Sequence, residues 1–311
     1  MTRWLKNLLG ITIIGFLLWY LAGQWESLKG LVNLKPSIII SLFITATLGV
    51  IVGSYTIQRL MAVFGIKPGF WEMFHLHNVT ILLNYLPMKF GTFYRANYLK
   101  RHHGLLYAHF TVLFIYLLIL MIIAATGVGF TVLVTIYDLN RDETLVLAII
   151  LLAFQIFSIV LVFIPMPVIR GTNIRAAIAL RNFAQGRMMM IKNKGNLFVS
   201  LLLAAGCFLV SSVQLGIIYH SLGQTVHPTG YLVLGSIAYV TMFLGITPGS
   251  LGLREIALAL GAVALGIDFT VGSLAAVIDR AVALVWSFTI GTASTLYLWH
   301  KYPQDFKKDE K

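Results

Sequence analysis

The sequence has little charge, and least of all negative charge. Only 11% of its 311 residues are Asp, Glu, Lys or Arg, and the 23 basic residues outnumber the 11 acidic ones. Hydrophobic residues make up 59% of the chain, and the mean hydropathy is +0.87. This composition excludes an ordinary water-soluble domain and indicates an integral membrane protein. Its net charge of +12 is then best explained by basic loops that contact anionic headgroups, so no nucleic-acid partner is expected.

Cysteine is nearly absent as well. Cys207 is the only one and lies inside an apolar run, which excludes a disulfide within the chain and a Cys-type zinc site. His75 and His77 are spaced poorly for ligands on one helix face, and His102 and His103 flank a basic cluster. We therefore expect neither a metal nor another cofactor.

Long apolar runs dominate what is present. A helix needs about 20 apolar residues to cross roughly 30 Å of hydrocarbon. Runs that meet this requirement are predicted to span the membrane, and they cover 8–23, 37–58, 105–136, 144–168, 196–219 and 272–299. The first of them has no small-residue cleavage site behind it and is interpreted as a retained helix. We expect an all-α polytopic membrane protein, one integral membrane domain over 1–311, with about six to eight transmembrane helices.

Two further apolar stretches are interrupted. The stretch 71–88 is broken by Asn84 and Pro87 and has basic residues at both ends, which predicts a segment that enters the membrane from the cytoplasm and returns. The stretch 229–267 is broken by TPGSLG and is predicted to begin and end outside. It is either a second re-entrant hairpin or a pair of full crossings, since the charge pattern fits both.

The distribution of Lys and Arg also predicts the orientation. It places the N-terminus and the tail 300–311 in the cytoplasm of a protein of the plasma (inner) membrane. The basic stretch between Arg170 and Lys194 is predicted to be internal, as a loop or an interfacial helix that contacts headgroups. A role as a topology signal alone is the alternative.

The two interrupted stretches share a pattern. In LPMKFGTFYR, from Leu86, and in TPGSLGLRE, from Thr247, a Pro is followed by three residues, a Gly and then an Arg. One copy opens to the cytoplasm and the other to the outside. This arrangement predicts an inverted repeat, with halves 1–136 and 144–299, in which broken helices meet near the membrane midplane and form a substrate site.

The second copy has the chemistry of an anion site. Pro248 lacks an N–H group, while Gly249 and Gly252 allow backbone conformations that other residues avoid. A helix is predicted to begin around 251–254, and its N-terminus carries a partial positive charge. With Arg254 beside it, the site favours a phosphate or carboxylate.

The acidic neighbour Glu255 has two explanations. An ionisable residue inside a membrane is costly and normally faces a partner or an aqueous path. Glu255 accompanies Arg254 on the substrate path or pairs with Arg280 in the last predicted span. Asp279 adjoins Arg280, but successive helical residues point about 100° apart, so Asp279 need not neutralise it. The alternative to a substrate path is a structural Glu255–Arg280 ion pair that joins two helices.

In the first copy, Lys89 and Arg95 would supply the corresponding positive charge, with Gly91 at the break. Their alternative role is as topology signals, because they adjoin Lys100 and Arg101.

At these residues the sequence resembles the lysylphosphatidylglycerol synthase transmembrane region family. The family signature Pro-Gly-x-x-Gly-x-Arg-Glu, followed by an Arg in the next helix, is matched by Pro248, Gly249, Gly252, Arg254, Glu255 and Arg280. The earlier family motif is similar to the first copy, but Met88, Lys89 and Thr92 stand where Gly, Arg and Glu are usual. The missing Glu puts a Glu-dependent role of this motif in doubt.

The resemblance implies a flippase or transporter for an anionic or phosphate-bearing lipid, either a phospholipid or a polyprenyl-phosphate-linked lipid. The soluble aminoacyl-transferase domain of some members is not expected here. The alternatives are an integral-membrane glycosyl or phospholipid transferase, and a non-catalytic partner subunit of a cell-envelope lipid pathway. Besides the lipid, a homo-oligomer or an envelope-biosynthesis partner is possible.

Overall fold

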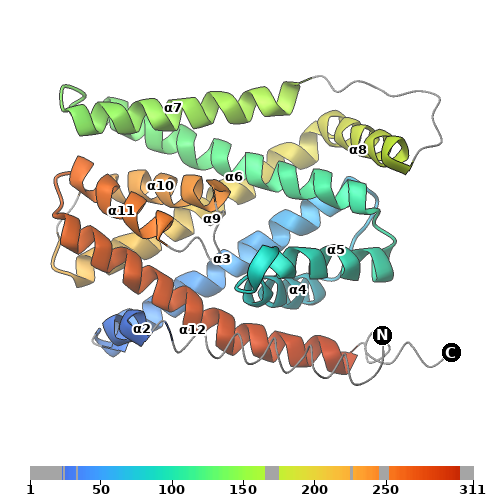
Figure 1. The fold of residues 1–311 in the computed structure, drawn as a ribbon, viewed down its shortest axis with the longest axis horizontal. Coiled ribbons are helices and arrows are strands. Elements are labelled where there is room, and N and C mark those ends of the chain that lie inside the picture. The colour runs from blue at the N-terminus through green and yellow to red at the C-terminus, as the bar shows by residue number, and fades with distance from the viewer. Residues whose placement is uncertain are drawn as a thin grey trace.

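The chain is a bundle of helices (Figure 1). The computed structural model describes residues 23, 25–32, 34–164, 175–224, 227–244 and 252–301. The helices in this part are α2 (Trp25–Val32), α3 (Pro36–Ala62), α4 (Phe70–Leu83), the 3-10 turn η1 (Pro87–Lys89), α5 (Phe90–His103), α6 (Tyr107–Ile136), α7 (Asp142–Phe163), α8 (Arg175–Lys192), α9 (Lys194–Ser221), α10 (Gly230–Leu244), α11 (Leu253–Ala264) and α12 (Phe269–Lys301).

Five helices of the described part are long and apolar enough to cross a membrane, namely α3, α6, α7, α9 and α12. They correspond to the predicted spans from 37–58 onward, and they confirm an all-α polytopic membrane fold. The predicted span 8–23 lies outside the described residues except for Gly23, as do residues 165–168 of the fourth span. The tail 300–311 is described only as far as Lys301, the last residue of α12.

Helices α4 and α5 form an antiparallel hairpin. Glu72, near the start of α4, accepts a hydrogen bond from Tyr98, while Thr80 accepts one from Arg95. Each helix has 14 residues, fewer than the roughly 20 needed to span a membrane. The predicted boundary was wrong: the returning segment is α5, beyond 88, because the prediction followed apolar residues and α5 is largely polar.

Helices α10 and α11 form a second hairpin. They have 15 and 12 residues, so neither reaches the length of a full crossing. Gly261 of α11 lies against Ile237 of α10, where a side chain would collide with it. Over the described residues these lengths fit the hairpin among the two alternatives for 229–267.

Both hairpins pack along α12 and approach it from opposite ends (Figure 1). The tip of the first packs Tyr85 and Leu86 against Leu284, whereas the start of α11 in the second contacts Asp279 and Arg280. Asp279 and Leu284 are five positions apart, or about 7 Å along the helix axis. Both contacts thus lie near the middle of α12. A repeat relation between 1–136 and 144–299 stays a prediction.

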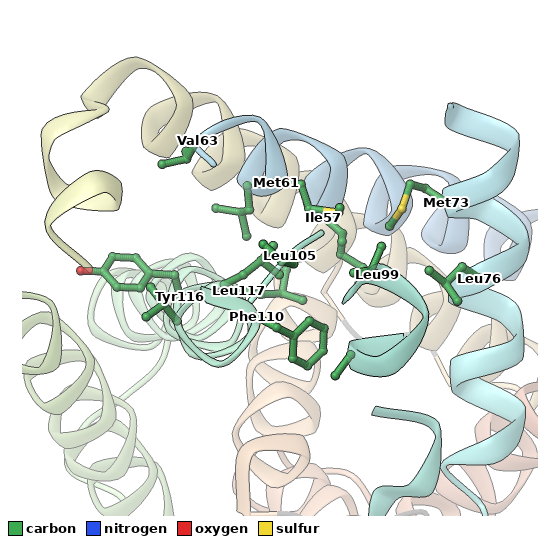
Figure 2. Close-up of a cluster of buried hydrophobic side chains, with 14 of the residues drawn as sticks. Ile57, Met61, Val63, Met73, Leu76, Leu99, Leu105, Phe110, Tyr116 and Leu117 are labelled. Carbon is green, nitrogen blue, oxygen red and sulfur yellow. The ribbon is translucent and has the colours of Figure 1, made fainter. Parts of the chain in front are cut away.

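An apolar cluster fixes the base of the first hairpin (Figure 2). Ile57 and Met61 of α3 pack with Met73 of α4, Leu99 of α5 and Phe110 of α6. Because four helices share this cluster, the open end of the hairpin is anchored in the bundle.

The basic segment after α7 contains a helix, α8. Arg187 donates a hydrogen bond to the carbonyl oxygen of Val162 at 2.8 Å, and α8 packs against α6. Arg170 lies outside the described residues.

The close contact inside the first hairpin generates a prediction. A Cβ atom at Gly91 would collide with the carbonyl oxygen of Thr80. We expect Gly91→Ala to lower the free energy of unfolding by about 1 to 3 kcal/mol, because the backbone of α4 must move. Gly195→Ala is the control, since a Cβ atom there meets nothing within 4 Å. Thermal unfolding in detergent measures both, and equal stabilities would contradict the packing.

Candidate functional site

Two ion pairs join the start of α11 to the middle of α12. Arg254 Nη2 lies 2.6 Å from Asp279 Oδ2, and Arg280 Nη1 lies 2.6 Å from Glu255 Oε1. On each helix the two charged residues are consecutive, so both pairs form side by side. The four side chains carry no net charge between them.

This arrangement changes the expected role of Arg254. The sequence predicted Arg254 as an anion ligand and assigned it no acidic partner on α12. In the structure, Asp279 points away from its neighbour Arg280 and neutralises Arg254 instead. The Arg254 side chain is still 34% exposed, and its Nε atom has no hydrogen-bond partner among the described residues. Because Nε is buried, contact with an anion would use the exposed part of the guanidinium.

A polar chain behind Asp279 was missed by sequence reasoning. Gln214 of α9 donates from Nε2 to Asp279 Oδ1 at 2.8 Å. Thr45 of α3 in turn donates to Gln214 Oε1 at 3.2 Å. The only signal in the sequence was a Gln inside the apolar run 196–219. Through these contacts α3 and α9 position the Asp279 carboxylate, which in turn pairs with Arg254.

The backbone at the second break fits the glycine there. Gly252 precedes α11 with φ of +78°, a left-handed conformation that side-chain-bearing residues rarely adopt. Its carbonyl oxygen accepts the hydrogen bond of Ile256 N–H at 3.0 Å. Pro248 and Gly249 of the same motif lie outside the described residues.

The first break is built without glycine at its sharpest point. Met88 and Lys89 have φ values of 60° and 51°, where a Cβ atom costs about 1 to 2 kcal/mol. Asn84 stabilises the turn, because its Oδ1 accepts from the backbone N–H of Thr92 at 3.0 Å and from the Thr92 hydroxyl at 3.3 Å. Asn84 thus caps the start of α5, and the hydroxyl of Thr92, where a Glu was usual in the resembled motif, helps to hold the Asn84 side chain.

Lys89 and Arg95, which the sequence grouped as one positive site, lie in different surroundings. Lys89 is exposed at the turn. Arg95 is only 5% exposed, and its Nε donates to Thr80 Oγ1 at 2.9 Å. The Thr80 hydroxyl donates its own hydrogen bond to the carbonyl oxygen of Leu76. Gly91 lies between Lys89 and Arg95 in the sequence, and its lack of a side chain lets α5 approach α4 closely.

The open end of the first hairpin has its own polar cluster. Glu72 accepts hydrogen bonds from the Tyr98 hydroxyl at 3.0 Å and from His103 Nε2 at 2.7 Å. Sequence reasoning did not single out Glu72, because it is one acidic residue in an otherwise apolar helix. The cluster joins the start of α4 to the end of α5.

The comparisons with known proteins now bear on this geometry. The family described as "Lysylphosphatidylglycerol synthase TM region" matches residues 7–291, a range that includes both hairpins and both ion pairs. The chain belongs to this family. No curated protein and no solved structure matches it. Membership in the lysylphosphatidylglycerol synthase TM region family, together with the spanning helices, makes the chain a multi-pass membrane protein with a lipid-related role of the flippase or transporter kind.

The ion pairs of this family member generate a stability prediction. Glu255→Gln and Arg280→Gln should each lower the free energy of unfolding by about 1 to 3 kcal/mol, because each leaves a partly buried charge without the opposite charge. The double variant should lose less than the sum of the two single losses. Chemical unfolding in detergent measures this coupling. Strict additivity would mean that the pair contributes nothing to the fold.

Proposed function

We propose that this protein moves a lipid with an anionic or phosphate-bearing headgroup across the membrane, along a polar path beside the middle of α12, against which both hairpins pack. The observation that carries the proposal is the position of the charges. Arg254, Glu255, Asp279 and Arg280 lie at the second tip, close to the middle of the spanning helix α12.

A charged group in hydrocarbon is costly whether it belongs to the protein or to a lipid. A helix that ends within the membrane presents N–H groups and charged side chains there. A headgroup can bind to these groups at a depth where the lipid chains offer it no polar contact. The acyl or polyprenyl chains can stay in the surrounding bilayer. A path of this kind needs no soluble domain.

The orientation belongs to the same proposal. The distribution of basic residues supports an orientation with both termini in the cytoplasm of an inner-membrane protein. The first hairpin would then enter from the cytoplasmic side and the second from the outside, so that one hairpin lies in each leaflet. This is the geometry that alternating access requires.

One observation favours a second candidate. Because each of the four charges at the second tip already has a partner, they could serve helix packing alone, in a partner subunit of a lipid pathway. A Glu255–Arg280 charge swap separates the candidates. Full cellular function after the swap supports the packing role, because a substrate path would meet the opposite sign of charge at each position.

Translocation tests the main proposal directly. Labelled phosphatidylglycerol, lysylphosphatidylglycerol and a polyprenyl phosphate would be followed in proteoliposomes that contain wild type or Arg254→Ala. We expect wild type to move at least one of them, and folded Arg254→Ala to move it about tenfold more slowly, because hydrogen bonds to the charged headgroup are lost.

Two controls complete the experiment. Lys194→Ala removes one exposed positive charge at the start of α9 and should leave the rate unchanged. Arg254→Ala combined with Asp279→Ala removes the pair without leaving a buried carboxylate. If the double variant regains the wild-type rate, Arg254 acts only by neutralising Asp279 and the proposed role of Arg254 is wrong.

A further inference from the structure

The two hairpins differ in charge balance. At the second tip, each arginine is matched by a carboxylate at 2.6 Å. In the first hairpin, Arg95 is almost fully buried, and its only hydrogen-bond partner in the described part of the chain is the neutral hydroxyl of Thr80. A guanidinium has five N–H donors, so most of those on Arg95 are unused.

The acidic residues of the chain are few enough to be followed one by one. Every carboxylate whose side chain the structure describes is engaged away from Arg95 or lies in a segment between helices or at a helix start. Glu72 binds Tyr98 and His103, Glu255 binds Arg280, Asp279 binds Arg254 and Gln214, Asp138 binds Asn140, Asp268 binds Thr270, and Asp142 and Glu143 lie at the start of α7. No carboxylate of this set neutralises Arg95.

A second buried group lies near this charge. His77 of α4 lies about one helical turn before Thr80, the hydrogen-bond partner of Arg95. Its Nδ1 atom is buried and has no hydrogen-bond partner among the described residues. Asn78, the next residue, is by contrast fully engaged with Trp286 and Phe74. Among the described residues, the hairpin therefore has a cation that no carboxylate neutralises and, about one helical turn from its hydrogen-bond partner, a polar atom without a partner.

We infer that Arg95 is the residue that binds the negative charge of the ligand, and that the ligand is a singly charged oxyanion, such as a phosphodiester. One unmatched guanidinium balances one negative charge, and its two terminal nitrogens can bind two oxygens of the same group. A buried charge without a counter-ion destabilises the protein, so an anion bound to Arg95 removes this cost. The arginines of the second tip do not bear it, because each has a carboxylate partner.

The inference deepens the proposed function and rests on it for the source of the anion, a lipid headgroup. It also separates the roles of the tips. The first hairpin balances the charge of the headgroup. At the second tip the ion pairs keep α11 against α12, and the exposed part of Arg254 contributes hydrogen bonds to the headgroup without balancing its charge. A phosphodiester in a headgroup without its own cation fits best. A neutral headgroup would leave Arg95 unbalanced, and in a zwitterionic headgroup the phosphate is already balanced by the headgroup's own cation.

The position of Thr92 allows the charge to be cancelled in place. Thr92 precedes Arg95 by three residues on α5, a spacing that brings side chains together on a helix. In Thr92→Glu, a carboxylate can pair with Arg95, and an acidic residue is tolerated in the first turn of a helix. Thr92→Gln is the matched control, because it has the same shape without the charge. Arg95→Gln removes the cation itself.

The experiment measures binding of short-chain phosphatidylglycerol to the purified full-length protein in neutral detergent, with short-chain phosphatidylcholine as the zwitterionic comparison. Wild type should bind phosphatidylglycerol more tightly. Arg95→Gln and Thr92→Glu should each raise its Kd about tenfold or more, whereas Thr92→Gln should stay within about twofold of wild type. Thermal unfolding confirms that each variant is folded.

Wild-type affinity in either folded charge-cancelling variant overturns the inference, as does an equal loss in Thr92→Gln. Inorganic phosphate serves as a competitor. If it displaces the lipid at a similar concentration, the site belongs to a free anion and the lipid source is wrong.

The two proposals fail separately. If binding depends on Arg95 but no lipid moves in proteoliposomes, the site stands and transport fails. If lipid moves while Arg95→Gln binds normally, transport stands and the assignment of Arg95 is wrong.

Discussion

The cost of placing a charge in hydrocarbon is the constraint on which this structure depends. Four charged side chains lie near the middle of α12, and each is 2.6 Å from a side chain of opposite charge. The pairs can form only if α11 starts at that depth, and α11 can start there only if the chain breaks within the membrane. The Pro-Gly-rich break, the short helices and the ion pairs are thus consequences of one requirement.

Small residues make the required approach possible. Gly272 of α12 lies against Ala259 and Ala262 of α11, and Gly291 lies against Leu82 of α4. Helices in a membrane gain little from the hydrophobic effect and associate through close packing and hydrogen bonds. The same helix α12 therefore accommodates one hairpin on each of its halves, and the hydrogen bond from Trp286 to Asn78 at 3.0 Å fixes the first of them.

The hairpins solve the problem of a buried arginine differently. Arg254 has Asp279 as a partner on the adjacent helix, whereas the one partner of Arg95 in the described part of the chain is Thr80. Motif similarity between the two breaks therefore does not imply equal chemistry. A carboxylate beside an arginine favours a stable helix contact, and an arginine without one favours a bound anion. In a lipid transporter these two properties are useful at different points of the path.

The sequence by itself determined the class of the protein. Apolar runs of sufficient length predict spanning helices whatever surrounds them, because the bilayer sets the length, and the two Pro-x-x-x-Gly breaks marked where helices stop. Gly252, Arg254, Glu255, Arg280, Gly91 and Arg95 were all identified from local patterns. The patterns could not provide the partner of each charge, because that partner lies on another helix, far away in the sequence.

Only the tertiary structure decided that Asp279 faces Arg254, that Gln214 and Thr45 support it, and that α5 rather than the end of 71–88 is the returning leg. These contacts depend on how helices rotate and cross, which the spacing along a single helix does not specify. Arg95 shows the difference most clearly. Its charge was evident from the sequence, but its isolation became visible only when the acidic residues of the described chain had been placed.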